Sequence, residues 1–243
     1  MQQMWNSPFL KQSLTSRLLH ILYPSYCPIC ENPSDTFYYS PICSPCWAMI
    51  KRYTGPACMI CAMPFPSEHA KICGHCTKKR PVFSRVVTYG VYEGVLAEAI
   101  HQFKFYGLKR LAGPLGNLLL NLEIPQTDGI TPVPLTKKGL RERGFNQSLL
   151  LARVISKEIK VPLLMDILYK KKDTPPQIGL SSKERLSNLK NAFEVKENIE
   201  GHRLLLVDDV ITTGATVTEC SRELLKAGAK EVIVIALARA GLD

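Results

Sequence analysis

The stretch LLLVDDVITTGAT, from Leu204 to Thr216, decides the fold of this chain. Its first half is a continuous apolar run, which predicts a buried strand over 203–207. Two acids, Asp208 and Asp209, stand at the end of that run, and a short loop rich in threonine and glycine leads into a predicted helix over 215–227. This order of parts predicts an α/β domain with a ligand site at the carboxyl end of the strand.

The same stretch carries candidate binding chemistry. The carboxylates of Asp208 and Asp209 can accept hydrogen bonds from two adjacent ribose hydroxyls. The loop after them presents backbone N–H groups and hydroxyls at a helix N-terminus, which suits a doubly charged phosphate, and its glycine permits a close approach. We therefore predict a ribose 5-phosphate site made by Asp208, Asp209, Thr212, Thr213, Gly214, Ala215 and Thr216. The competing interpretation is that the two acids only cap a helix.

Strands and helices alternate on the N-terminal and C-terminal sides of this stretch. Further strands are predicted over 85–92, 129–133, 163–168 and 231–238, and helices over 93–105, 108–122 and 145–160. Two of the strands are apolar throughout, so we expect an α/β fold with a mostly parallel sheet and helices on both faces. A polar segment over 169–190 is long for a connection within a compact domain and is predicted to be functional.

The cysteines predict a second module. Eight of the nine form four C-x-x-C pairs at even intervals: Cys27 and Cys30, Cys43 and Cys46, Cys58 and Cys61, and Cys73 and Cys76. Each pair can place two sulfurs on one tetrahedral ion, so two pairs complete a closed four-cysteine site of the structural zinc type. We predict two such sites, in which consecutive pairs share an ion; the spacing is also compatible with an interleaved pairing.

Other uses of these cysteines are less consistent with the sequence. Ligand type alone does not exclude an iron–sulfur cluster, but paired knuckles favour zinc. Disulfides require an oxidising compartment, and the first residues lack the features of a signal peptide. We therefore expect a leader helix and double zinc ribbon over 1–80, followed by the α/β domain over 81–243, in a cytoplasmic protein without a transmembrane segment.

Basic residues are concentrated in one part of the chain. The formal net charge is +10, and residues 131–190 hold thirteen Lys or Arg against five Asp or Glu. Such a surplus suits a polyanion, either a diphosphate or a nucleic-acid backbone, although a solvated basic surface gives the same composition.

Several motifs resemble those of known families. The stretch 204–216 closely resembles the phosphoribosyl-diphosphate signature of type I phosphoribosyltransferases. Nearly the whole chain resembles the ComF competence family, which is also described as amidophosphoribosyltransferase-like. Besides the cysteine pairs, the resemblance rests on Phe103-Lys104-Phe105-Tyr106-Gly107, Val133-Pro134-Leu135, Arg141-Glu142-Arg143-Gly144-Phe145-Asn146-Gln147, Gln177 with Leu180 and Arg185, and Asn191-Ala192-Phe193.

The resemblance implies a substrate and further site residues. It implies phosphoribosyl diphosphate bound with Mg²⁺, with the diphosphate on the loop that holds Thr136 and Lys137. The segment 169–190 then corresponds to a hood that closes over the substrate, with Arg185 as a contact. His101, Lys104 and Tyr106 are candidates to line the site, although a role on the helix surface is equally consistent. By this resemblance the protein acts in natural transformation on single-stranded DNA, with the competence machinery at the inner face of the membrane.

Two classes of function stay open at this point. The first is a phosphoribosyltransferase, in which Asp208 and Asp209 act on the substrate mainly by positioning and electrostatics. Its acceptor is not identified by the sequence. The second is a non-catalytic sensor of a phosphoribosyl ligand whose basic surface and zinc ribbons hold single-stranded DNA. The fold alone does not decide between them.

Overall fold

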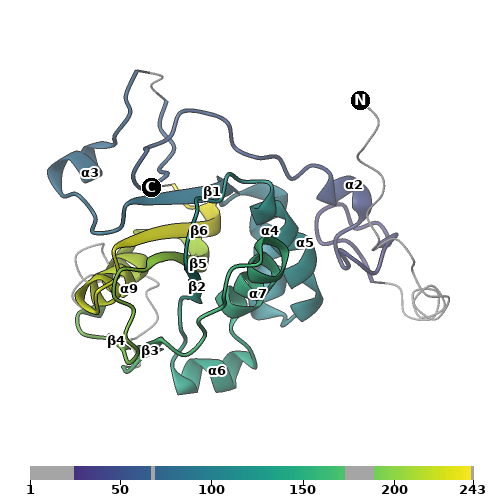
Figure 1. Ribbon diagram of the computed structural model, residues 1–243. Coiled ribbons are helices and arrows are strands. Elements are labelled where there is room, and N and C mark those ends of the chain that lie inside the picture. The colour runs from purple at the N-terminus through teal and green to yellow at the C-terminus, as the bar shows by residue number, and fades with distance from the viewer. Residues whose placement is uncertain (1–24, 67–68, 173–188, 242–243) are drawn as a thin grey trace. The chain divides into compact units, whose positions relative to one another are not determined.

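The computed structural model describes residues 25–66, 69–172 and 189–241 (Figure 1). The predicted leader helix and most of the predicted hood lie outside these residues. Contacts divide the chain into two compact units, Met1–Ile50 and Lys51–Asp243. The predicted domain boundary at residue 80 was drawn from the sequence motifs, whereas the boundary at residue 50 reflects contacts within each unit. The boundary at residue 80 therefore stays a prediction.

The described elements carry the labels of Figure 1. The strands are β1 (Arg85–Val91), β2 (Gly129–Pro132), β3 (Leu168–Lys170), β4 (Phe193–Val195), β5 (Arg203–Ile211) and β6 (Glu231–Arg239). The helices are α2 (Ser44–Trp47), α3 (Gly74–Lys78), α4 (Gly94–Phe105), α5 (Ala112–Leu120), α6 (Lys137–Arg143), α7 (Gln147–Ile159) and α9 (Ala215–Lys226), with a 3₁₀ turn at Lys109–Leu111.

A parallel sheet forms the centre of the second unit. Its four strands lie in the order β1-β6-β5-β2, with the two apolar strands β5 and β6 in the middle. Figure 1 shows α4, α5 and α7 on one side of the sheet and α9 on the other. Strands buried on both faces are expected to be apolar throughout, and the predicted α/β fold with a mostly parallel sheet is confirmed. Strands β3 and β4 form a separate antiparallel pair.

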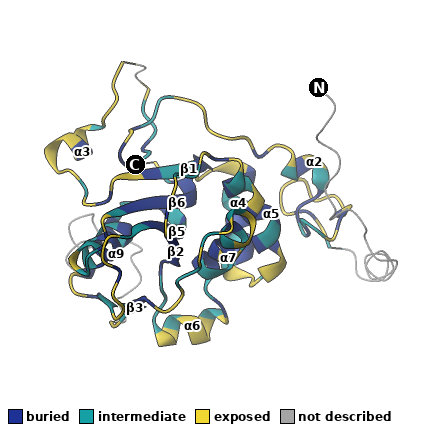
Figure 2. Cartoon of the chain, in the orientation of Figure 1, coloured by how far each residue is buried: buried dark blue, intermediate teal, exposed yellow. Residues whose placement is uncertain are grey.

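The second group of cysteines belongs to the core of this unit. Cys58, Cys61 and Cys76 are buried in one cluster with Val217 of α9 and with residues of the central strands. Figure 2 shows the central strands β5 and β6 largely in the colour of buried residues. The segment 53–60, which includes Cys58, also covers the outer edge of β1: the Val86 N–H donates to the Ile60 carbonyl at 2.8 Å, and the Tyr53 N–H donates to the Tyr89 carbonyl at 2.9 Å. The edge strand is therefore paired along part of its length.

Three predicted elements differ from the structure. The strand expected to end before the acids continues to Ile211, because its pairing with β6 extends to Arg239. Of the strand expected over 163–168, Leu163 makes only an isolated parallel bridge to Ile130, and β3 begins at Leu168. The loop after β2 contains a short helix, α6, which begins where the Thr136 hydroxyl accepts the Gly139 N–H at 3.0 Å. Among the described residues, no helix is long and apolar enough to cross a membrane.

Candidate functional site

The acidic pair lies near the carboxyl end of β5. One oxygen of Asp208 accepts hydrogen bonds from the Ser148 hydroxyl at 3.2 Å and from the Asp209 N–H at 2.9 Å. Asp209 is buried and accepts the Val210 N–H at 2.7 Å. These contacts fix both carboxylates at the edge of the sheet where ligands of parallel α/β folds bind.

Lys104 of α4 also reaches the acidic pair. Its ammonium nitrogen lies 2.9 Å from Oδ2 of Asp209, and the two side chains are 22% and 8% exposed. Burial by itself would lower the pKa of Lys104, but the nearby charges of Asp209 and Asp208 raise it. The backbone of Lys104 is fixed as well, since the side-chain amide of Gln147 donates to its carbonyl at 3.4 Å. The site therefore contains a cation held between α4 and β5.

Asp208 is the titratable member of the site near neutral pH. Burial, followed by the negative charge of Asp209, raises the pKa of Asp208 to about 7. The charge of Lys104 and the hydrogen bond from Ser148 act in the opposite direction and are weaker. Both the neutral and the charged carboxyl are therefore accessible around pH 7.

The loop of residues 212–216, called the cradle loop below, follows the acids directly. Gly214 caps α9 in the left-handed conformation, with φ of 77°, and the Thr213 hydroxyl accepts the Ala215 N–H at 3.3 Å. Among the described residues, the N–H groups of Thr212, Thr213 and Gly214 have no acceptor. Free N–H groups at a helix N-terminus suit an anion. A small hollow brings this loop together with the first acid; it is lined by Asp208, Thr212, Gly214, Ala215 and Thr216.

A second pocket lies beside α6 and the β3–β4 pair. It has a volume of about 500 Å³, and Thr136 and Tyr169 line it together with one carboxylate, Glu194. The Lys196 ammonium lies 4.6 Å from the centre of the Tyr169 ring. We call this second pocket the basic pocket, because six cations line it: Lys137, Lys138, Arg141, Lys170, Lys171 and Lys196. Six cations against one carboxylate suit a multiply charged anion.

The eight paired cysteines form two separate clusters. The first cysteine site consists of Cys27, Cys30, Cys43 and Cys46, and the second consists of Cys58, Cys61, Cys73 and Cys76. Within each site the sulfurs lie within 4.8 Å of one another, and the Sγ–Sγ distances between Cys30 and Cys43 and between Cys61 and Cys73 are both 3.6 Å. Tetrahedral zinc with bonds of about 2.3 Å separates its sulfurs by about 3.8 Å. Both sites therefore fit zinc, with the consecutive pairing that was predicted, and none of these eight cysteines, all within the described ranges, is in a disulfide.

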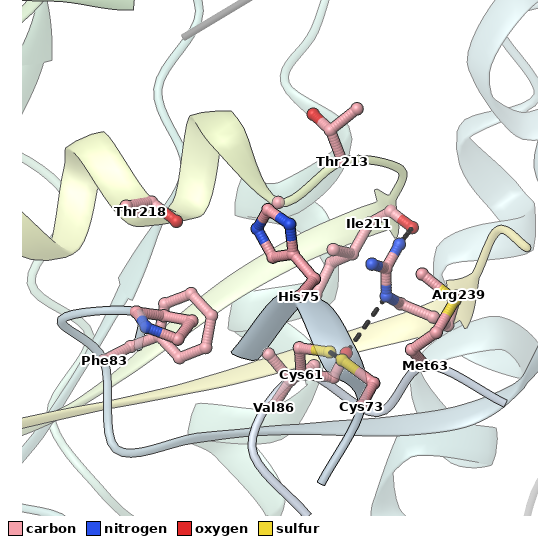
Figure 3. Close-up of a pocket in the computed structure, with 12 residues that line it drawn as sticks. Cys61, Met63, Cys73, His75, Phe83, Val86, Ile211, Thr213, Thr218 and Arg239 are labelled. Carbon is pink, nitrogen blue, oxygen red and sulfur yellow. Dashed lines mark hydrogen bonds between the residues drawn. The ribbon is translucent and has the colours of Figure 1, made fainter. Parts of the chain in front are cut away.

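A third pocket lies between the second cysteine site and the cradle loop, and residues of both line it (Figure 3). Its volume is about 110 Å³, and its lining includes Cys61, Cys73, His75, Phe83, Thr213 and Arg239. Figure 3 shows the Arg239 guanidinium between the Cys61 backbone and the end of β5.

Two domain families match the chain, and they match it in the order expected. The double zinc ribbon domain matches residues 18–77, and the phosphoribosyl transferase domain matches residues 146–242.

Whole-length relatives extend this match. DNA utilization protein YhgH of Escherichia coli K12 is 35% identical over 226 residues, which cover 89% of this chain and 97% of the relative. Competence protein F of Haemophilus influenzae is 37% identical over 212 residues, which cover 82% and 90%. This chain belongs to the ComF competence protein family. A more distant member, competence protein ComFC of Bacillus subtilis, is 28% identical over 198 residues, which cover 77% of this chain and 79% of that protein.

Solved structures similar to this ComF-family chain include an amidotransferase and a phosphoribosyltransferase. The glutamine phosphoribosylpyrophosphate amidotransferase of Bacillus subtilis is 25% identical, with a TM-score of 0.37, and the match covers 51% of this chain and 25% of that one. A purine phosphoribosyltransferase of Pyrococcus horikoshii is 21% identical, with a TM-score of 0.32, over 56% and 75% of the two chains.

The predicted site residues of this ComF-family protein fall into two groups. Asp208, Asp209 and the cradle loop lie together, whereas Thr136 and Lys137 line the basic pocket. Arg185 lies outside the described residues. Of the three candidate lining residues, Lys104 contacts the acidic pair, while Tyr106 is 64% exposed at the end of α4.

Two residues of the site were not found from the sequence. Ser148, which donates to Asp208, directly follows the Arg141–Gln147 motif and has no signal of its own. Arg239 had a signal: it is the first charge after the apolar run of β6, at the carboxyl edge of the sheet.

Proposed function

We propose that this ComF-family protein binds phosphoribosyl diphosphate with Mg²⁺ and transfers its phosphoribosyl group during the handling of single-stranded DNA in natural transformation. The observation that carries the proposal is the placement of free cradle-loop N–H groups beside Asp208 in one hollow. The names of its relatives, competence protein and DNA utilization protein, support the role in DNA uptake.

The two groups of residues would bind different parts of the substrate. The 5-phosphate accepts hydrogen bonds from the N–H groups of the cradle loop, and Gly214 leaves room for it. The ribose hydroxyls donate to the carboxylates of Asp208 and Asp209. The diphosphate occupies the basic pocket, where Lys137 and its neighbouring cations offset its charge.

Transfer of the phosphoribosyl group breaks one bond and forms another at C1 of the ribose. The C1–O bond to diphosphate breaks, and the diphosphate leaves with the electron pair. The lone pair of the acceptor forms the new bond to C1, and the proton of the acceptor passes to bulk water. Positive charge that develops on the ribose is stabilised by the carboxylates of Asp208 and Asp209, while the cations of the basic pocket stabilise the leaving group.

Mg²⁺ would enter with the substrate. It prefers oxygen ligands, and the site offers a carboxylate in Asp208, whose neighbour Asp209 is already paired with Lys104. Bound Mg²⁺ would neutralise part of the diphosphate charge. Ionised Asp208 is the form that suits both the cation and the ribose hydroxyls.

Calorimetric titration tests this proposal. Phosphoribosyl diphosphate is added with Mg²⁺ to the zinc-loaded full chain and to a variant with Asp208→Ala and Asp209→Ala. We expect saturable binding that the variant loses while its far-UV circular dichroism stays native. Absence of binding by the folded wild type refutes the substrate, and diphosphate release with single-stranded DNA or nucleotides as acceptors tests turnover.

A second candidate is a non-catalytic sensor that holds single-stranded DNA. It is favoured by the rings of Phe105 and Tyr106, which are 62% and 64% exposed beside the acidic site. The Arg143 guanidinium lies 6.0 Å from the Phe105 ring centre. Exposed rings next to cations suit stacked bases and phosphates. Binding of both ligands without diphosphate release, whatever the acceptor, distinguishes this candidate from a transferase.

We also propose a cytoplasmic location. Two sites of four cysteines without disulfide bonds are maintained in a reducing compartment. Contact with the inner membrane would then occur through partners. Fractionation of cells that express the tagged protein tests this location.

A further inference from the structure

Arg239, the last residue of β6, is a buried cation with an unusual set of partners. Arg239 is only 3% exposed to solvent. None of the ion pairs among the described residues involves it, so no carboxylate there offsets its charge. A buried guanidinium requires compensation for the lost hydration. Its compensation therefore has to come from other groups.

The hydrogen bonds of Arg239 join two parts of the site. Its Nε donates to the carbonyl of Cys61, a ligand of the second cysteine site, at 3.0 Å. Its Nη1 donates to the carbonyl of Ile211 at 2.8 Å (Figure 3). The same nitrogen donates to the carbonyl of Thr212 and to that of Ala240, the latter at 3.2 Å. One side chain thus connects a cysteine knuckle to the start of the cradle loop.

These bonds fix the direction of the cradle N–H groups. In a trans peptide the C=O and N–H bonds point to opposite sides. Because Arg239 holds the carbonyls of Ile211 and Thr212, the N–H groups of Thr212 and Thr213 point away from the guanidinium. These two N–H groups are among those of the cradle loop that have no acceptor among the described residues. The Ala240 N–H also donates to the Ile211 carbonyl, at 2.9 Å, so the orientation of the anion-binding groups depends on this backbone contact at Ile211 and on the Arg239 side chain at both carbonyls.

The second cysteine site lies next to this cation, because Nε of Arg239 donates to the carbonyl of its ligand Cys61. Burial lowers the pKa of Arg239, and the cysteines of this site act in the opposite direction. Four thiolates with one Zn²⁺ carry a net charge of −2, so a zinc-loaded site can compensate a neighbouring cation. Loss of the ion would change both the charge beside Arg239 and the position of the Cys61 carbonyl.

We infer that Arg239 is a positioning residue that couples zinc in the second cysteine site to the geometry of the cradle loop, so that zinc and a phosphate ligand bind cooperatively. The identity of the phosphate ligand rests on the proposed function, whereas the coupling between zinc and the cradle loop does not. Coupling between two sites is reciprocal. Zinc then tightens phosphate-ligand binding by the same factor by which the ligand tightens zinc, on the order of 5- to 150-fold.

The first experiment measures the loop without any ligand. Amide hydrogen exchange of residues 210–216 is compared in the zinc-loaded full chain, in Arg239→Lys and in Arg239→Gln, with Arg85→Gln as a control at an exposed arginine of β1. The lysine variant keeps the charge and loses the forked donor. We expect at least fivefold faster exchange in both Arg239 variants, with no change over 147–159 or in the control. Wild-type exchange in folded Arg239→Lys overturns the inference.

The second experiment removes zinc and does not depend on how the Arg239 variants fold. A Cys30→Ser background removes the first cysteine site, so that a chromogenic chelator reports zinc release from the second site only. Zinc removal is expected to accelerate exchange at 210–216 more than at 147–159, and equal acceleration overturns the coupling. Added ribose 5-phosphate is expected to slow zinc release at least fivefold in this background, and not in Arg239→Lys.

The two experiments distinguish a failure of this inference from a failure of the proposed function. If ribose 5-phosphate neither binds nor slows zinc release, while zinc and Arg239 still control exchange at 210–216, the coupling stands and the proposed ligand is wrong. If the ligand binds but zinc release is unchanged, the ligand stands and the coupling is wrong.

Discussion

The ammonium of Lys104 lies 2.9 Å from the carboxylate of Asp209, although one belongs to α4 and the other to β5. This ion pair offsets the charge of Asp209, whereas none of the ion pairs among the described residues involves Asp208. It also explains how the buried acid Asp209 is tolerated beside Asp208 near the end of an apolar strand.

Removal of Lys104 is expected to destabilise the fold through Asp209. In Lys104→Met the buried carboxylate loses its partner, and we expect the free energy of unfolding to fall by about 2 kcal/mol. In the double variant Lys104→Met, Asp209→Asn the unpaired charge is gone, so the combined loss should be smaller than the sum of the single losses. Urea unfolding of the four proteins measures this coupling; losses that add within about 0.5 kcal/mol contradict it.

Asp208 is expected to make stability depend on pH. Its pKa is raised from 3.8 to about 7, so protonation of Asp208 stabilises the folded state. That stabilisation is complete below the unfolded pKa and is lost as the pH rises through about 7. Asp208→Asn does not ionise, and its advantage over the wild type should grow by about 1 kcal/mol between pH 6 and pH 8. Unfolding curves at both pH values check this, and a constant difference refutes the raised pKa.

Gly214 is expected to matter for ligand binding beyond its effect on stability. Its φ is 77°, and a Cβ there would meet only Ile211 Cγ2 at 3.9 Å, so Gly214→Ala costs about 1–2 kcal/mol through backbone strain alone. Gly94→Ala is a matched control, since φ is 53° and nothing lies within 4 Å. Thermal unfolding should show similar losses of stability for the two variants. Titration with phosphoribosyl diphosphate should show weaker binding for Gly214→Ala only. Equal affinities of the two variants would place the ligand elsewhere.

The two cysteine sites are expected to differ in their effect on the α/β unit. Cys76 is buried in the core that contains α9, whereas Cys30 belongs to the Met1–Ile50 unit and is exposed. Cys76→Ser should lower the midpoint of the helical circular dichroism transition by about 10 °C, which corresponds to a loss of several kcal/mol. Cys30→Ser should leave that midpoint unchanged. Identical shifts for both variants would contradict the division into two units.

Phe105 and Tyr106 are expected to contribute to single-stranded DNA binding. Alanine at both positions should weaken binding of a labelled oligonucleotide by about 1–3 kcal/mol per stacked base. Because both rings are exposed, the unfolding midpoint should change little. Tyr92→Ala, at an exposed ring before the start of α4, is the control for fluorescence anisotropy measurements. An equal loss of affinity in the control would show that the effect is not specific to the end of α4.

Local signals in the sequence were sufficient for the main elements and for part of the site. The apolar runs of β5 and β6 predicted central parallel strands because a strand buried on both faces has no polar positions. The threonine- and glycine-rich segment predicted the cradle loop, since the loop and its helix are contiguous in the chain. The spacing of the cysteines predicted two four-cysteine sites for the same reason.

The ends of elements were predicted less well. The strand with Asp208 and Asp209 was expected to end before them, yet Asp208 pairs with Ala236 and the ladder continues to Ile211. A polar residue ends a strand in a sequence pattern, but hydrogen bonding to the neighbouring strand decides where the strand ends. The short helix α6 was hidden for a similar reason, because its few residues carry charges that also suit a loop.

The sequence by itself therefore determined the class of the fold, the cradle loop and the cysteine ligands, because each depends on residues close together in the chain. Tertiary structure alone decided that Lys104 pairs with Asp209, that Ser148 donates to Asp208, and that Arg239 joins a cysteine knuckle to the cradle loop. Each of these contacts joins elements far apart in the sequence. Their geometry follows from the strand order and from which helices cover the sheet, and no local pattern carries that information.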